Sequence, residues 1–227
     1  MNKQLTELAF ILDRSGSMQS IADAAIEGFN FFLHEQQHGQ GHARLTVVLF
    51  DDEYLVPVQS MPVDEVIPLD HTTYVPRNST ALLDAIGRTI DELGCRLAAL
   101  PEAARPGKVI VAILTDGLEN ASVRETWRAV SGRIRHQTEK YSWEFLFLGA
   151  NQDAIATAAQ LNIGASNSAS YCADSIGVRS TARSISRKSA ALRARAAGVA
   201  TPEEEQDAAA PMQELVQEED RKGREKP

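Results

Sequence analysis

The stretch LAFILDRSGSM, residues 8–18, joins a continuous apolar run to a short polar loop. Five apolar residues in a row indicate a strand that is covered on both faces, as the strands of parallel sheets are. The loop then carries side-chain oxygens at every second position, on Asp13, Ser15 and Ser17, and Gly16 relaxes the backbone between them. The stretch therefore predicts a buried strand that ends in a ligand-binding loop, because ligands collect at the carboxyl ends of parallel strands.

Three further apolar runs have the same character, at residues 47–50, 109–114 and 145–148. Stretches with helical period separate the runs, and this alternation predicts an α/β fold with a doubly wound, mostly parallel open sheet (Rossmann-like) and helices on both faces. Only three residues separate run 47–50 from residues 54–56, so we expect an antiparallel edge strand there. Further helices are expected over 122–139 and 153–160, and a short last strand over 165–171.

Composition limits the class of protein. The chain has 227 residues, is 43% hydrophobic and carries a net charge of −8, which favours one globular unit and argues against general nucleic-acid binding. No apolar run approaches the ~20 residues that span a bilayer, and the first residues lack the apolar core of a signal peptide. We therefore expect a cytoplasmic protein without membrane partners. Cys95 and Cys172 show no metal or redox spacing, and we expect both to be small core residues.

The C-terminal part divides by charge. We expect a domain over 1–172, a basic helix over 173–197 packed on or extending from it, and a disordered charged tail over 198–227 that is too poor in large apolar residues to order itself. The helix carries six basic residues and no acid between Arg179 and Arg195. A solvated outer face, neutralised in part by the acidic tail, is the favoured interpretation, and binding of an acidic partner or nucleic acid is the alternative.

A second acid follows a second strand. Asp116 comes directly after run 109–114, so Asp13 and Asp116 are expected at the same edge of the sheet. Carboxylates and hydroxyls without histidine or thiolate are hard oxygen ligands, which suit Mg²⁺ or Mn²⁺ and fit zinc poorly. The loop residues Asp13, Ser15 and Ser17 can point one way and touch one ion. The sequence therefore predicts a divalent cation site.

These motifs together resemble a known family. Asp-x-Ser-x-Ser at 13–17, a separate threonine in NSTALLDAI at 78–86 and Thr-Asp-Gly at 115–117 are similar to the von Willebrand factor A (VWA) domain and its metal-ion-dependent adhesion site. The similarity covers roughly residues 5–172 and is to the compact bacterial or phage type. It implies five ligands for a divalent cation, Mg²⁺ first with Mn²⁺ or Ca²⁺ as alternatives: Asp13, Ser15, Ser17, Thr80 and Asp116.

The resemblance also implies a function. In such a site one coordination position stays open, and a glutamate or aspartate of a partner protein fills it. We therefore expect a metal-dependent protein–protein interaction module. Some related domains work beside AAA+ ATPases, and this partner is carried over by family analogy alone.

Each candidate ligand has a simpler interpretation. Ser15 and Ser17 can act as turn or N-cap residues of the next helix, and Asp116 can cap the helix that follows it. Thr80 lies beside Ser79, which can itself cap a helix. The joint order of the motif pieces, each in its strand context, favours the metal site over these capping roles.

Other polar side chains belong to the same predicted edge. Asp51 follows run 47–50 and is expected in the hairpin turn, with support of the metal site as the alternative. Asn151 follows run 145–148, and contact with a partner is one option for it. His34 and His38 stand four residues apart on a helix, where a solvated helix end is favoured over a metal site.

An enzyme is the alternative function, since Mg²⁺ beside carboxylates at strand ends also serves phosphohydrolases. The haloacid-dehalogenase pattern begins with Asp-x-Asp, but Ser15 stands where the second acid would be. Neither Gly-x-Gly-x-x-Gly nor Gly-Lys-Ser/Thr is present. We therefore expect no enzyme, and a Mg²⁺-dependent phosphohydrolase using the same site remains the alternative.

Overall fold

The computed structural model describes residues 1–150 and 154–225 and contains one six-stranded sheet. The strand order is β3-β2-β1-β4-β5-β6, with β3 antiparallel to β2 and every other pair parallel. The strands are β1 (Asn2–Asp13), β2 (His42–Phe50), β3 (Tyr54–Pro62), β4 (Pro106–Thr115), β5 (Glu144–Ala150) and β6 (Ser168–Tyr171). The predicted fold class is confirmed, including the antiparallel edge strand.

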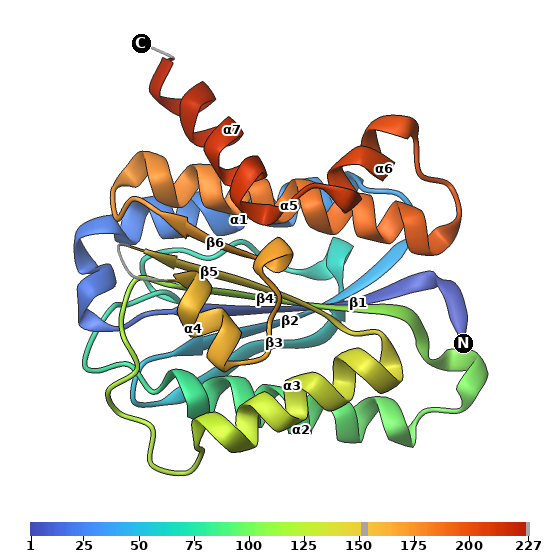
Figure 1. Cartoon of the computed structure of the whole chain (residues 1–227), viewed down its shortest axis with the longest axis horizontal. Helices are drawn as coiled ribbons and strands as arrows, with labels where there is room; N and C mark the ends of the chain where they lie inside the picture. The colour runs from blue at the N-terminus through green and yellow to red at the C-terminus, as the bar shows by residue number, and fades with distance from the viewer. Residues whose placement is uncertain (151–153, 226–227) are drawn as a thin grey trace.

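Helices cover both faces of the sheet (Figure 1). The α-helices are α1 (Ala22–His38), α2 (Leu82–Ala99), α3 (Trp127–Tyr141), α4 (Ala154–Gln160), α5 (Ser175–Ala197), α6 (Pro202–Ala209) and α7 (Met212–Glu225). Short 3₁₀ helices are η1 (Gly16–Ile21), η2 (Val63–Glu65), η3 (Glu102–Ala104) and η4 (Ala165–Asn167). Apolar residues of α1, α5, α6 and α7 pack with one face of the sheet, and those of α2, α3 and α4 pack with the other. The loops after β1 and β4 lie at the left-hand edge of the view in Figure 1.

The C-terminal stretch 198–227, predicted to be disordered, is helical and packed over most of its described part. Met212, Leu215 and Val216 lie on one side of α7 and are buried in the core. The side chain of Gln213 closes the edge of β6, because its Oε1 accepts from the Ser170 amide at 2.9 Å and its Nε2 donates to the Ser170 carbonyl at 3.3 Å. The prediction of a disordered tail is therefore wrong for α6 and α7. Three apolar residues at helical spacing are enough to hold α7 in place, because α5 provides a surface on which they are buried.

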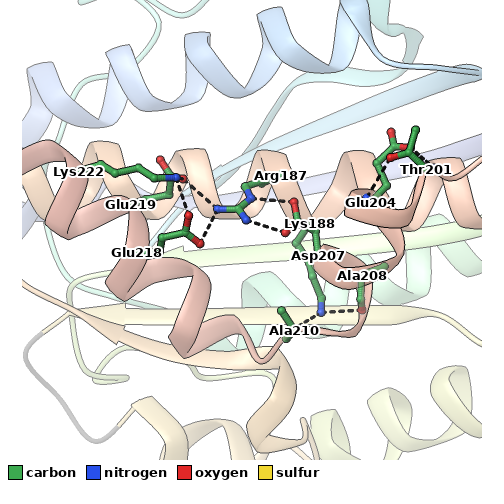
Figure 2. A network of polar contacts seen from close by, with 10 residues as sticks. All are labelled: Arg187, Lys188, Thr201, Glu204, Asp207, Ala208, Ala210, Glu218, Glu219 and Lys222. Atoms are coloured by element: carbon green, nitrogen blue, oxygen red, sulfur yellow. Dashed lines mark hydrogen bonds and ion pairs between the residues drawn. The ribbon is translucent and has the colours of Figure 1, made fainter.

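Charge holds these last helices to α5 (Figure 2). Arg187 of α5 donates to both carboxylate oxygens of Asp207 on α6, at 2.6 and 2.7 Å, and to Glu218 and Glu219 on α7 at 3.0 and 3.1 Å. Lys188 is buried and donates to the carbonyls of Ala208, in the last turn of α6, and of Ala210, the residue directly after α6. The predicted neutralisation of the basic helix by the acidic tail is confirmed at Arg187.

The interpretation of the basic helix as a solvated face is wrong for two of its members. Lys188 and Arg193 are both buried, and Arg193 donates to the backbone and side chain of Gln36 on α1, each at 2.9 Å. The error arises because α5 is covered by other helices on two sides. Arg193 reaches carbonyl oxygens at the end of α1, and Lys188 reaches carbonyl oxygens at the end of α6. Cys95 and Cys172 are exposed, which corrects their assignment to the core.

Candidate metal centre

Asp13 is the last residue of β1, and the structure fixes its carboxylate on both sides. Its side chain is 0% exposed. Oδ1 accepts from the Ser15 amide at 2.7 Å and Oδ2 accepts from the Thr115 hydroxyl at 2.5 Å, while the Asp13 carbonyl accepts from the Tyr74 hydroxyl at 2.6 Å. The carboxylate is thus held in place at the end of the strand without an ion pair among the described residues.

The five predicted ligands lie together around Gly117. A Cβ atom built on Gly117 would stand 2.7 Å from Thr80 Oγ1 and 3.5 Å from both Asp13 Oδ2 and Ser15 Oγ. Ser15 Oγ lies 3.1 Å from Ser17 Oγ, which donates to Asp116 Oδ1 at 2.6 Å. The structure therefore brings all five side chains to one place, and a side chain at position 117 would fill the space between three of them.

The donor set fits a hard divalent cation. It offers two carboxylates and three hydroxyls, all of them oxygen ligands of the kind that Mg²⁺, Mn²⁺ and Ca²⁺ accept. Within residues 1–150 and 154–225 no group of three or more His, Cys, Asp or Glu side chains could hold a metal ion. The candidate site is of another kind, because it has only two carboxylates and its other three ligands are hydroxyls. The hydroxyls of Ser15 and Ser17 now satisfy one another, and a cation would replace those bonds.

Burial controls the charge of both acids. It raises the pKa of Asp13 from 3.8 to about 6, although the hydrogen bonds from Thr115 and Ser15 act in the opposite direction. Burial also raises the pKa of Asp116, against the hydrogen bond from Ser17. A cation in contact with these groups would favour their charged forms, and in its absence the protein must bury negative charge.

The capping interpretations do not match the observed helix ends. Ser15 precedes η1 but makes no capping hydrogen bond with its side chain. The residue before α2 is Ala81, so Ser79 is not its N-cap. The N-cap of α3 is Thr126, which accepts from the Ala129 amide at 3.2 Å, so Asp116 does not cap that helix. The polar side chains of the site are thus directed at one another rather than at helix ends.

Asp51 joins two loops of the site. It is buried, and its carboxylate pairs with Arg14 at 3.2 Å and with Arg77 at 2.8 Å. Its backbone carbonyl accepts from the Ala81 amide at 2.8 Å. Arg14 adjoins Asp13, and Arg77 and Ala81 flank Thr80, so Asp51 ties the first loop to the threonine loop. The predicted place of Asp51 in the hairpin turn is confirmed, because its carboxylate accepts from the Glu53 amide. Support of a metal site by Asp51 stays a prediction.

Two acids that the sequence analysis missed brace the loop after Asp116. Glu119 accepts from the amides of Leu83 and Ser122 at 2.9 and 2.8 Å. Asp84 accepts from the amides of three successive residues, 123 to 125. These bonds keep residues 119–125 out of the helix predicted over 122–139, so α3 begins at Trp127. No periodicity reveals such long-range partners, and only a structure could find them.

Other predicted features lie elsewhere. His34 and His38 stack on α1 with ring centroids 4.3 Å apart, and both are exposed. Asn151 and Asp153 lie outside the described residues. Among the described helices, none is both long and apolar enough to cross a membrane.

The sequence itself finds no match, either to a protein-family model or to a curated protein. Solved structures share the fold. A von Willebrand factor type A protein from Catenulispora acidiphila aligns with a TM-score of 0.54 and 17% identity, over 82% of this chain and 43% of that one. The manganese-loaded TRAP protein of Plasmodium vivax aligns at 0.52 and 14%, over 76% and 70%.

A third structure is proximal thread matrix protein 1 from the mussel byssus with a zinc-occupied MIDAS motif. It aligns with a TM-score of 0.52 and 15% identity, over 82% of this chain and 46% of that one. The chain thus spans less than half the length of the Catenulispora and mussel proteins. At such identities the likeness concerns the fold, and this chain has the fold of a von Willebrand factor type A domain.

Proposed function

We propose that the chain is a metal-dependent protein-interaction module. Asp13, Ser15, Ser17, Thr80 and Asp116 hold a divalent cation, and a glutamate or aspartate of a partner protein completes its coordination. The observation that carries this proposal is the convergence of the five side chains around Gly117. A cation supplies the positive charge that attracts the partner's acid and fixes its position.

The metal is Mg²⁺ in this proposal, with Mn²⁺ and Ca²⁺ as alternatives, because all five side chains offer hard oxygens. The manganese and zinc named for the Plasmodium and mussel structures support a divalent cation at this place in the fold. They do not distinguish Mg²⁺ from the others.

Burial suggests which side of the site faces the partner. Asp13, Ser15 and Thr80 are buried, whereas Ser17 is exposed and Asp116 is half-buried. In the proposal the first three form the floor that anchors the cation, and the partner's carboxylate approaches from the side of Ser17 and Asp116. The burial of Asp13 also favours cation binding, because a buried carboxylate without a nearby positive charge destabilises the metal-free site.

Two short peptides test the proposed partner chemistry. The probes are Ac-Gly-Glu-Gly-NH₂ and its glutamine counterpart, added to ¹⁵N-labelled protein in Mg²⁺ or in EDTA. The proposal predicts amide shifts around residues 13–17 and 116–117 with the glutamate peptide in Mg²⁺ only. Equal shifts with the glutamine peptide, or shifts that persist in EDTA, would contradict a metal-bridged acid.

The proposal assigns no enzymatic activity. A Mg²⁺-dependent phosphohydrolase would turn over p-nitrophenyl phosphate, and loss of that turnover in Asp13→Asn would favour the enzyme over the interaction module. The cytoplasmic location stays a prediction from the sequence, and the AAA+ partner stays an expectation from family analogy.

A further inference from the structure

The loop after Asp116 exposes large apolar side chains beside the metal centre. Leu118 is 65% exposed and Val123 is 88% exposed. Val123 also lines a cleft of about 640 Å³ that reaches Ala81, next to Thr80, and Leu55 at the start of β3. Leu118 and Val123 stand on the same short loop, and large apolar side chains left exposed on one loop are typical of a contact surface.

This loop is fixed although it buries little of its own apolar surface. Asn120 exchanges hydrogen bonds with Thr80, since its side chain accepts from the Thr80 amide at 2.9 Å and its amide donates to the Thr80 carbonyl at 3.1 Å. The Ser122 hydroxyl accepts from the Asp84 amide at 3.0 Å. Together with the bonds to Glu119 and Asp84 described above, these contacts attach residues 119–125 to the first turn of α2. Leu118 and Val123 thus stand on a braced support, which lowers the entropy that a partner must remove on binding.

The same loop carries one free positive charge. The side chain of Arg124 is exposed and forms no ion pair within residues 1–150 and 154–225. Six acids line the cleft, and each has a partner. Glu125 and Asp91 pair with Arg133 at 2.6 and 2.9 Å, Glu92 pairs with Arg88 at 2.7 Å, and Glu53 pairs with Arg77. The carboxylate of Asp52 accepts from the Asn78 side chain, and that of Asp84 accepts from three backbone amides. The surface beside the metal centre therefore combines apolar side chains with an available cation.

We propose that residues 117–125 form the contact surface for the chain segment that flanks the partner's metal-bound acid. The occupant is an extended protein segment in which the acid is followed by aliphatic side chains, which pack on Leu118 and Val123, and by a second acid, which pairs with Arg124. This proposal rests on the proposed function, because the metal-bound acid sets the register of the segment.

Matched peptides separate this surface from the metal site. The probes are Ac-Gly-Glu-Leu-Leu-Glu-Gly-NH₂ and Ac-Gly-Glu-Ser-Ser-Glu-Gly-NH₂, titrated in Mg²⁺ against the wild type, a Leu118→Ser/Val123→Ser variant and Val199→Ser. Val199 is an exposed aliphatic residue two positions after the end of α5. The end of α5 lies near the start of β1, because the Ala197 carbonyl accepts from the Gln4 side chain, whereas the metal centre lies at the end of β1. Val199→Ser controls for the general loss of surface hydrophobicity.

The wild type and Val199→Ser are expected to bind the leucine peptide about tenfold more tightly than the serine peptide, as burial of part of two leucine side chains implies. In Leu118→Ser/Val123→Ser the two affinities become equal, while Mg²⁺ affinity measured by calorimetry is unchanged. Arg124→Gln should weaken both peptides equally. Equal binding of the two peptides by the wild type, no binding of the leucine peptide, or a leucine preference that survives the double substitution would overturn the proposal. If the wild type did not bind Mg²⁺ at all, that result would instead contradict the proposed function.

Discussion

At the scale of single residues, Asp13 decides how the site responds to protons and cations. Its carboxylate is buried, and its pKa is raised to about 6 because burial disfavours the charged form. Below that pH the group is protonated, and a cation must displace the proton in order to bind. Above it the carboxylate is already charged and stands ready for the metal.

Metal affinity should therefore depend on pH with a definite sign. As the pH rises from 5 to 7 the association constant for Mn²⁺ increases by about tenfold, and it levels off above pH 7 once Asp13 is charged. Calorimetric titrations at pH 5, 6, 7 and 8 in buffers of equal ionic strength would show this curve. A constant affinity across the range would mean that binding of the metal does not compete with protonation of Asp13.

At the scale of elements, the two last helices are held to α5 by one central arginine. Arg187 serves three acids on two helices, of which Asp207 and Glu219 are 18% and 11% exposed. Within the described part of the chain, Arg195 forms an ion pair only with Glu205, which is 50% exposed. Ion pairs of the second kind contribute little. Removal of Arg187 leaves the largely buried Asp207 without an ion pair, whereas Glu218 and Glu219 keep their ion pairs with Lys222.

Substitution of these two arginines should thus have unequal effects. Arg187→Met keeps most of the aliphatic stem and is expected to lower the free energy of unfolding by about 2–4 kcal/mol, and Arg195→Met by less than about 1 kcal/mol. Urea unfolding followed by circular dichroism measures both. Equal, small losses would show that the network of Figure 2 does not hold the helices.

Substitutions on the apolar side of α7 give a second, independent measure of how much this helix contributes to the free energy of unfolding. Leu215 is buried in the core, and Leu215→Ala should cost about 2–5 kcal/mol, whereas Val199→Ala at an exposed position should cost less than about 0.5 kcal/mol. Deletion of residues 198–227 should be more damaging than Leu215→Ala. An unfolding temperature that is unchanged by the deletion would support the disordered tail that the sequence suggested.

At the scale of the whole molecule, the sequence predicts what continuous apolar runs and short motifs encode. Run 8–12 and the oxygens of Asp13, Ser15 and Ser17 predict the sheet and the first loop of the site, because strand ends and ligand edges follow from local pattern. The last helices escaped prediction because Met212, Leu215 and Val216 form too short an apolar stripe to stand alone. They become stable only on α5.

The hydrogen bonds and ion pairs that hold the loops of the site in place could not be predicted from local sequence pattern either, because they join residues far apart in the chain. Asp84 and Glu119 look like ordinary polar residues, and their partners lie about forty residues away along the chain. Asp51 looks like a turn residue until the ion pairs with Arg14 and Arg77 are seen. A sequence shows which side chains can bind a cation, and the tertiary contacts decide whether they are held for it.

The central claim is that one divalent cation binds at Asp13. Calorimetry of Mg²⁺ and Mn²⁺ should be carried out at pH 7.5 on EDTA-treated wild type, Asp13→Asn and Asp23→Asn. Asparagine has nearly the shape of aspartate and removes a buried charge, but it keeps only one of the two oxygens that accept from the Ser15 amide and the Thr115 hydroxyl. Circular dichroism of Asp13→Asn therefore precedes the titration and establishes that the variant is folded. Asp23 is an exposed carboxylate near the amino end of α1 and is the matched control. One equivalent bound by the wild type and Asp23→Asn, and none by Asp13→Asn, is the predicted result. Equal binding by all three proteins, or binding by none, would contradict the metal centre.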